Sequence, residues 1–363
     1  MILDQRDGEI VRTRSSENRD VNDIWMCDKG WFGYEYSSYK ARLQKPMIRK
    51  NGRLEVAGWE EALSLIASKF KEAKISGKLA GWGGNPLTSE ECYLFQKIFR
   101  EGGGVNHLDH RIGTPVFSLD EEGLPPGMEV DIGECEKLSN ALLLGVDITE
   151  EFPVIWLRLK QGINHGAKVA FAGHFAPEVA CHLNKVILHP PGEELKILKS
   201  LLHEFSNQVT HGQNAIFIGR QYLAGKDRLA ILTQLVQFQE AHPGVSLNLL
   251  EGKGNSIGAR VSGMHPEEGP LGEKLAVPGL SAVDLLETTA KEGWDLLYVA
   301  GADPAKKFPA KVWNEARSRL GFLVVQDIFL TETGRQADVV LPSLCSLEKE
   351  GSFINIAWRD RKS

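Results

Sequence analysis

Short apolar runs that end at Gly, Asp or Pro recur along this chain, and stretches with a helical pattern separate several of them. Each run has the length and composition of a strand that is buried on both faces. Strands that alternate with helices indicate βαβ units and a mainly parallel sheet. The expected strands lie at 78–82, 141–144, 168–171, 186–188, 215–218, 296–299, 322–325 and 339–341.

Helix signals stand between these runs. Residues 59–73 repeat their apolar side chains at helical spacing. Thr88 and Glu91 have the spacing of a capping box at the start of residues 88–101, and Pro153 fits the first position of a helix. Further helices are expected at 153–164, 193–208 and 226–240.

Length, charge and cysteine content set broad limits. A chain of 363 residues exceeds what one hydrophobic core usually supports, so we expect two or more lobes. The net charge of −6 and the lack of a basic block argue against nucleic acid as a partner. No apolar run is as long as a membrane span. The five cysteines form no CxxC, which argues against a disulfide framework or a self-contained zinc site and fits a reducing cytoplasm.

Two loop regions stand out. Residues 113–136 are rich in Gly, Pro and acidic residues, so we expect a long surface excursion there. The turn after the expected strand 322–325 is polar, and ligands of open parallel sheets bind beyond the carboxyl ends of strands. This pattern predicts a ligand-binding edge or its remnant, although capping of a helix and a strand end explains the same residues. The polar residues of this turn are Gln326, Asp327, Thr331, Glu332 and Thr333.

Several motifs, spread over the whole length, resemble one superfamily. The C-terminal motifs GADP, QDIFLTET, ADVVLP and EKEGSFIN stand in the order found in molybdopterin oxidoreductases. Residues 18–36, 105–111 and 150–169 resemble segments of the G-type subunit of proton-translocating NADH:quinone oxidoreductase (complex I). Each motif is weak by itself, and their order along the chain makes the resemblance specific.

The resemblance implies an α/β fold of two interleaved, doubly wound parallel-sheet lobes. Residues 1–50 are expected to be a short β-rich remnant of an iron–sulfur domain. Residues 51–136 together with 251–363 form one expected lobe, and residues 137–250 form the inserted lobe.

Cys27 corresponds to the fourth ligand of a [4Fe–4S] cluster in this family. Such clusters need four thiolates or close substitutes, and no other cysteine here has a suitable spacing. Three interpretations remain open. The chain is a fragment, truncated at both ends; or it is one half of a split subunit whose partner supplies the other thiolates; or the cluster is lost and Cys27 is an ordinary thiol.

The implied pterin site departs from the pattern of active molybdenum enzymes. Residues 107–117 hold no Cys or Ser where such enzymes place the metal ligand. His107, His110 and Arg111 fit an anion or pterin contact or a metal ligand, yet a loop whose side chains bond to backbone is the favoured interpretation. Asp303 joins Asp327, Thr331, Glu332 and Thr333 as candidate pterin-edge residues, with helix capping as the simpler explanation.

The turn at Gly81, Gly83 and Gly84 looks like a phosphate-cradling loop, but no GxGxxG or GK[ST] accompanies it, so NAD binding is not supported. No complete catalytic constellation is present in the sequence.

The leading hypothesis is therefore a structural, electron-transfer-associated part of the G-type subunit, on the cytoplasmic peripheral arm and in contact with the other subunits of that arm. A formate-dehydrogenase-like molybdenum or tungsten oxidoreductase is the alternative. A cofactor-free docking or assembly protein is a third possibility.

Overall fold

A computed structural model describes residues 1–112, 127–209, 212–250 and 254–362. The chain divides into two compact units. Unit 1 comprises Met1–Tyr36, Ser118–Glu251 and Ile356–Trp358, and unit 2 comprises Ser37–Phe117, Gly252–Asn355 and Arg359–Ser363. The chain thus passes between the two units several times.

Unit 1 is built on a parallel five-stranded sheet in the order β11–β10–β7–β8–β9. Its strands are β7 (Asn140–Leu144), β8 (Lys168–Gly173), β9 (Lys185–Leu188), β10 (Asn214–Ile218) and β11 (Val245–Leu249). The first strand lies in the middle, so the chain winds outwards in both directions, as in doubly wound folds.

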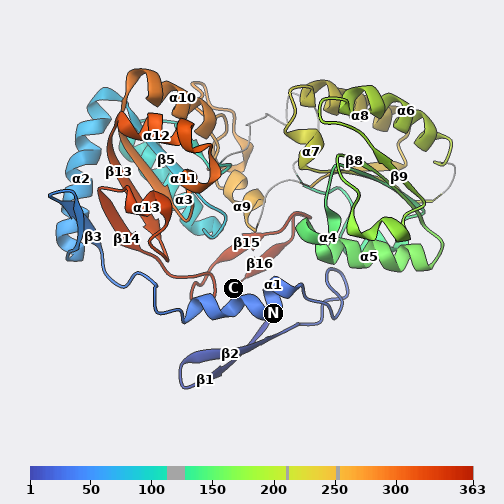
Figure 1. The fold of residues 1–363 in the computed structure, drawn as a ribbon, viewed down its shortest axis with the longest axis horizontal. Coiled ribbons are helices and arrows are strands. Elements are labelled where there is room, and N and C mark those ends of the chain that lie inside the picture. The colour runs from blue at the N-terminus through green and yellow to red at the C-terminus, as the bar shows by residue number, and fades with distance from the viewer. Residues whose placement is uncertain (113–126, 210–211, 251–253, 363) are drawn as a thin grey trace. The chain divides into compact units, whose positions relative to one another are not determined.

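Helices cover both faces of this sheet (Figure 1). On one face lie α6 (Glu194–Ser206) and α8 (Arg228–Ala241), and on the other lie α4 (Ile148–Glu151) and α5 (Pro153–Asn164). Pro153 occupies the first turn of α5, as the sequence indicates. The short helix α7 (Arg220–Leu223) follows β10. Trp156 and Phe171 belong to the core between α5 and the sheet.

The N-terminal part of unit 1 is an antiparallel hairpin of β1 (Ile2–Arg6) and β2 (Glu9–Arg14), followed by the short helix α1 (Asp28–Phe32). Arg158 of α5 fastens the loop before α1. Its guanidinium donates to the carbonyls of Val21 and Arg19 at 3.0 and 2.5 Å, and it pairs with Glu136 at 2.6 Å.

Unit 2 contains a seven-stranded sheet in the order β4–β3–β14–β13–β12–β5–β6. The five strands from β14 to β6 are parallel, and β3 and β4 add an antiparallel edge. The strands are β3 (Met47–Lys50), β4 (Arg53–Val56), β5 (Leu79–Gly83), β6 (Leu108–Asp109), β12 (Trp294–Ala300), β13 (Leu320–Asp327) and β14 (Val339–Pro342). β3 and β4 thus join residues 47–56 to this sheet.

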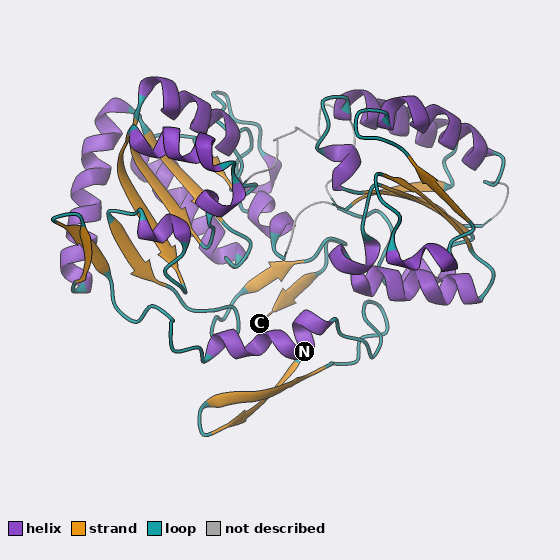
Figure 2. Cartoon of the chain, in the orientation of Figure 1, coloured by secondary structure: helices purple, strands orange, loops and turns teal. Residues whose placement is uncertain are grey.

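Helices again enclose the sheet (Figure 2). α2 (Trp59–Ser76) and α3 (Ser89–Lys97) pack on one face, where the core includes Ile66 and Phe99. α10 (Ala282–Glu292) and α12 (Ala310–Ser318) pack on the other face through Leu285 and Trp313. Thr88 and Glu91 form the expected capping box at the start of α3. Unit 2 also contains α9 (Ser256–Val261), α11 (Pro304–Lys307), α13 (Glu332–Arg335), β15 (Ser352–Ile354) and β16 (Asp360–Lys362).

These findings confirm the expected α/β class, the parallel doubly wound sheets and the β-rich N-terminal region. Each of the eight apolar runs overlaps a strand. Among the described residues, no helix is both long enough and apolar enough to cross a membrane.

The expected surface excursion at 113–136 needs a correction. Residues 113–126 lie outside the described residues. Met128, Ile132 and Cys135, by contrast, are buried in the core of unit 1. Spaced apolar side chains thus anchor residues 128–135 in the core of unit 1, although Gly, Pro and acidic residues are frequent in this sequence.

Candidate functional site

The predicted ligand-binding edge of unit 2 lies at the carboxyl ends of β5, β12 and β13, which are neighbours in the sheet. The loops after β5 and β12 meet there directly. The backbone N–H of Gly84 donates to the carbonyl of Ala300 at 2.7 Å. A Cβ added at Gly84 would stand 1.7 Å from the carbonyl oxygen of Gly301. Glycine is therefore needed at position 84, because the backbone of the loop after β12 leaves no room for a side chain there.

The other glycines of the turn also face protein. A Cβ at Gly81 would stand 2.6 Å from the ring of Phe95, and one at Gly83 would stand 2.6 Å from the methyl group of Met264. Packing against the protein thus accounts for all three glycines. The phosphate-cradling interpretation of this turn gains no support from their surroundings.

Asp303 and Thr333 hold the loops after β12 and β13 together. One carboxylate oxygen of Asp303 accepts hydrogen bonds from the backbone N–H of Thr333 at 3.0 Å and from its hydroxyl at 2.5 Å. The Thr333 hydroxyl oxygen accepts from the backbone N–H of Ala305 at 3.0 Å. Thr333 is fully buried. The two residues thus form an internal latch between two loops.

Thr331 and Glu332 begin α13. The hydroxyl of Thr331 accepts from the backbone N–H of Gly334 at 3.1 Å, which makes it the N-cap of that helix. Glu332 is exposed in the first turn, where a negative charge is favourable. Both residues have a structural role in this arrangement, and a pterin contact by either stays a prediction.

Asp327 ends β13 in a partly buried position. Desolvation raises the pKa of this carboxyl to about 6, although hydrogen bonds from the backbone of Ile328 and Phe329 lower it in part. The negative charge of nearby Asp303 adds to the rise. Asp327 is thus a desolvated acid at the expected ligand-binding edge. Its carboxyl could accept a proton or a hydrogen bond from a ligand.

The cluster at 107–111 binds mainly to other parts of unit 2. His107 Nδ1 accepts from the backbone N–H of Leu280 at 2.9 Å. His110 Nδ1 lies 2.7 Å from the carbonyl of Met264. Burial, with a smaller effect from Arg111, lowers the pKa of His110 to about 4, so its ring is neutral. The two imidazoles thus bond to backbone, as the favoured interpretation expects, whereas Arg111 contacts the side chain of His265.

Asp109 and Arg111 complete that cluster. Asp109 is fully buried and accepts from the backbone N–H groups of Ala282 and Arg111, each at 2.9 Å. A guanidinium nitrogen of Arg111 lies 2.6 Å from His265 Nε2. Burial and the charge of Arg111 keep the pKa of His265 well below its ordinary range. The cluster thereby fastens residues 107–111 to residues 264–282.

Cys27 precedes α1 as its N-cap residue and is half-buried. Its carbonyl accepts from the backbone N–H groups of Gly30 and Trp31 at 2.8 and 3.0 Å. Within the described part of the chain, no group of three or more possible metal ligands includes it. A [4Fe–4S] cluster needs four thiolates or close substitutes, so the role of Cys27 as a cluster ligand stays a prediction.

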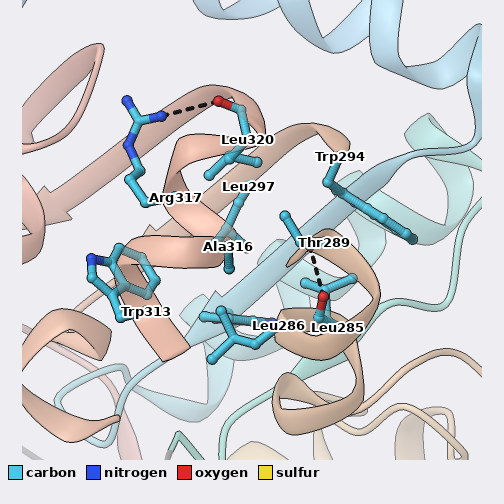
Figure 3. Close-up of a pocket in the computed structure, with 10 residues that line it drawn as sticks. Leu285, Leu286, Thr289, Trp294, Leu297, Trp313, Ala316, Arg317 and Leu320 are labelled. Atoms are coloured by element: carbon cyan, nitrogen blue, oxygen red, sulfur yellow. Dashed lines mark hydrogen bonds between the residues drawn. The ribbon is translucent and has the colours of Figure 1, made fainter. Parts of the chain in front are cut away.

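A small hollow lies between α10, α12 and the sheet of unit 2 (Figure 3). Its volume of about 10 Å³ is enough for about one water molecule. Most of its lining is apolar, and Trp294 and Leu286 belong to it. We interpret it as a packing defect, because it is far smaller than a ligand pocket.

Sequence reasoning missed a second polar group, in unit 1. His174, His189 and Glu194 each offer a ligand atom, and these atoms lie within 4.8 Å of one another. The sequence did contain an indication of this group, because each histidine directly follows a strand. His174 follows β8, and His189 follows β9. Such positions at the carboxyl ends of parallel strands are typical of ligand sites.

The fold and the motifs together define an α/β protein with two doubly wound units. Residues 42–362 match the family model described as Molybdopterin oxidoreductase. The chain belongs to the molybdopterin oxidoreductase family.

Its relatives include two kinds of protein at similar identity. The putative formate dehydrogenase YrhE of Bacillus subtilis (strain 168) is 28% identical over 432 residues, which cover 97% of this chain and 44% of that protein. The G-type subunit of the NADH-quinone oxidoreductase of Streptomyces coelicolor is 27% identical over 408 residues, which cover 99% of this chain and 47% of that protein. The chain spans about half the length of these relatives.

The structure of acetylene hydratase from Pelobacter acetylenicus shares the fold. The two structures superpose with a TM-score of 0.70 at 13% sequence identity. The matched part comprises 99% of this chain and 63% of the acetylene hydratase chain. At this identity the likeness concerns the fold alone.

Proposed function

We propose that this chain is a structural, electron-transfer-associated part of a G-type subunit of NADH:quinone oxidoreductase, and that it does no substrate chemistry itself. The observation that carries the proposal is the closure of the edge at β5, β12 and β13. Gly84 contacts the backbone at Gly301, and Asp303 is bonded to Thr333. Groups that would otherwise meet a ligand hold neighbouring loops together.

A molybdopterin cofactor, as the family implies, would need donors and acceptors at such an edge. Gly84, Asp303 and Thr333, in the arrangement described above, do not fit this cofactor. A phosphate or pterin ring at the Gly84 turn would have to displace the loop at Gly301, and one at Asp303 would have to compete with Thr333. We therefore derive no reaction step through this cofactor.

Cys27 supports an electron-transfer role. In the proposed assembly it is one of four ligands of a [4Fe–4S] cluster, and a preceding or separate polypeptide segment provides the other three. The loop before it is held by the buried Arg158, which gives this thiol a defined place on unit 1. Subunits of the cytoplasmic peripheral arm are the proposed partners, because two relatives carry the name of this G-type subunit.

Co-expression with an upstream iron–sulfur polypeptide tests this role. We expect iron in the co-purified complex, and we expect Cys27→Ala to remove about four irons per complex. Cys181→Ala is the matched control, because Cys181 is an exposed free thiol and its loss should leave the iron content unchanged. An iron content that is the same in Cys27→Ala and in the unaltered chain would refute the assignment of Cys27.

A formate-dehydrogenase-like molybdenum or tungsten oxidoreductase is the second candidate. Asp327 favours it, since a carboxyl with a pKa of about 6 at the end of β13 can exchange a proton near neutral pH. Relatives named as formate dehydrogenases at 26–28% identity add to it. Formate-dependent reduction of a dye by the purified chain, lost in Asp327→Asn, would favour this candidate over the first.

A further inference from the structure

A pocket of about 580 Å³ opens in unit 1, at the carboxyl ends of its parallel strands. Three segments line it, and each follows a different strand. His174 comes after β8, Gly192 and Glu194 come after β9, and Arg220, Gln221 and residues 224–227 come after β10. The pocket therefore lies where open parallel sheets usually place a ligand.

Three side chains with metal-ligand chemistry lie close together here: His174 and Glu194 line the pocket, and His189 lies beside them. Ligand atoms of His174, His189 and Glu194 lie within 4.8 Å of one another, and His174 Nε2 is 2.7 Å from a carboxylate oxygen of Glu194. His189 and Glu194 are 4% and 5% exposed. Buried charges in proteins are paired or coordinate a metal ion, and Glu194 is placed for either arrangement.

Neighbouring groups hold these side chains in place. The backbone N–H of Gly192 donates to both carboxylate oxygens of Glu194, at 3.0 and 2.9 Å. His189 Nε2 lies 2.9 Å from the hydroxyl of the fully buried Tyr222. Gln221 accepts from the backbone N–H of His174 at 2.8 Å. Supporting bonds of this kind orient the ligands of metal sites.

We propose that His174, His189 and Glu194 form a binding site for a divalent transition-metal ion of the zinc class. Two imidazoles and one carboxylate are a ligand set that zinc accepts, and three protein ligands leave one position open. His174 and Glu194 also line the pocket, so a metal ion held by them would lie at its wall. Tetrahedral ligands about 2.1 Å from zinc stand about 3.4 Å apart, so binding draws the ligand atoms together and replaces the bond between His174 and Glu194. It also replaces one of the two His189 contacts, either that of Nδ1 with the carbonyl of Pro190 at 3.1 Å or that of Nε2 with the Tyr222 hydroxyl at 2.9 Å.

The same contacts allow a metal-free arrangement, in which His174 and Glu194 simply pair with each other. The two arrangements predict different behaviour toward added metal. A hydrogen-bonded pair does not bind zinc at a defined stoichiometry, whereas a metal site does.

Titration of the metal-free, chelator-treated chain distinguishes these cases. Calorimetry with Zn²⁺ is expected to show one site per chain, and Co²⁺ is expected to show visible absorption without the charge-transfer band of a thiolate ligand. Glu194→Gln and His189→Gln should each weaken zinc binding at least about tenfold. His203→Gln is the matched control, because His203 is an exposed histidine of α6 in the same unit.

Thermal unfolding distinguishes a variant that has lost the metal site from one that does not fold. Zinc should raise the melting temperature of the unaltered chain and of His203→Gln, because a ligand that binds the folded state stabilises it. It should not raise that of Glu194→Gln. A lack of saturable binding to the unaltered chain would overturn the proposal whatever the variants do. Unchanged affinity in folded Glu194→Gln and His189→Gln would overturn it as well.

Discussion

Asp303 receives two hydrogen bonds from one residue, the backbone N–H and the hydroxyl of Thr333. The two residues stand 30 positions apart in the sequence and follow neighbouring strands, β12 and β13. The bond to the hydroxyl is short, at 2.5 Å, as expected when the acceptor is charged. This pair joins two loops that in a working ligand site would face the ligand.

Replacing Thr333 with Val tests how much the latch contributes to stability. Valine keeps the shape of threonine but removes the donor to Asp303 and the acceptor for the N–H of Ala305. Leaving these groups without partners should lower the free energy of unfolding by about 2 kcal/mol. Urea unfolding followed by tryptophan fluorescence measures this loss. Thr233→Val, at an exposed position of α8, serves as the control and should change stability by less than about 0.5 kcal/mol.

Stability should depend on pH through Asp327. Its pKa is raised from 3.8 to about 6 in the folded protein, so between these values the folded state holds the proton more tightly than the unfolded chain. The buried carboxyl therefore costs stability as the pH rises through this window, and the full cost applies above pH 6. At about 1.4 kcal/mol per pKa unit, the cost amounts to at most about 3 kcal/mol.

Asp327→Asn removes this cost while keeping the shape of the side chain. We expect the stability advantage of the variant over the unaltered chain to grow by about 2 kcal/mol between pH 4.5 and 7.5. Urea unfolding at several pH values gives this difference directly. An advantage that stays flat with pH, or that shrinks as the pH rises, would contradict the desolvation of Asp327.

Gly84 and Gly102 offer a matched pair for testing the closed edge. A methyl group at Gly84 would meet the backbone oxygen of Gly301 at 1.7 Å, and a carbonyl cannot rotate away as a side chain can. Gly84→Ala should therefore cost more than about 3 kcal/mol or prevent folding. At Gly102 no atom lies within 4 Å of the added methyl group. Gly102→Ala should change stability by less than about 0.5 kcal/mol, as measured by thermal unfolding.

Much of the fold could be predicted because its strands are buried on both faces and read as plain apolar runs. β11 was not predicted, because Ser246 and Asn248 interrupt its apolar residues. Asn248 is fully buried, accepts from the backbone N–H of Glu129 and donates to the carbonyl of Ile216. A buried polar residue whose partners are distant in sequence looks, in the sequence alone, like a residue of a loop.

The candidate sites were less predictable, for a related reason. The sequence indicates that Asp303 and Thr333 each follow a strand, but not that they bond to each other. His174 and Glu194 are separated by 20 positions and meet only because β8 and β9 are neighbours. Which loops touch at a sheet edge depends on strand order, and the spacing of residues along the chain does not reveal it.

We propose that the pterin-enzyme fold serves in this chain as a scaffold without its usual cofactor. The most direct test of this proposal is the molybdenum and tungsten content of the chain after expression in a host that makes the pterin cofactor. We predict less than about 0.1 equivalent of either metal per chain, because the loops after β5, β12 and β13 are bonded to one another. About one equivalent of molybdenum or tungsten, retained through purification, would contradict the account and favour the formate-dehydrogenase-like alternative.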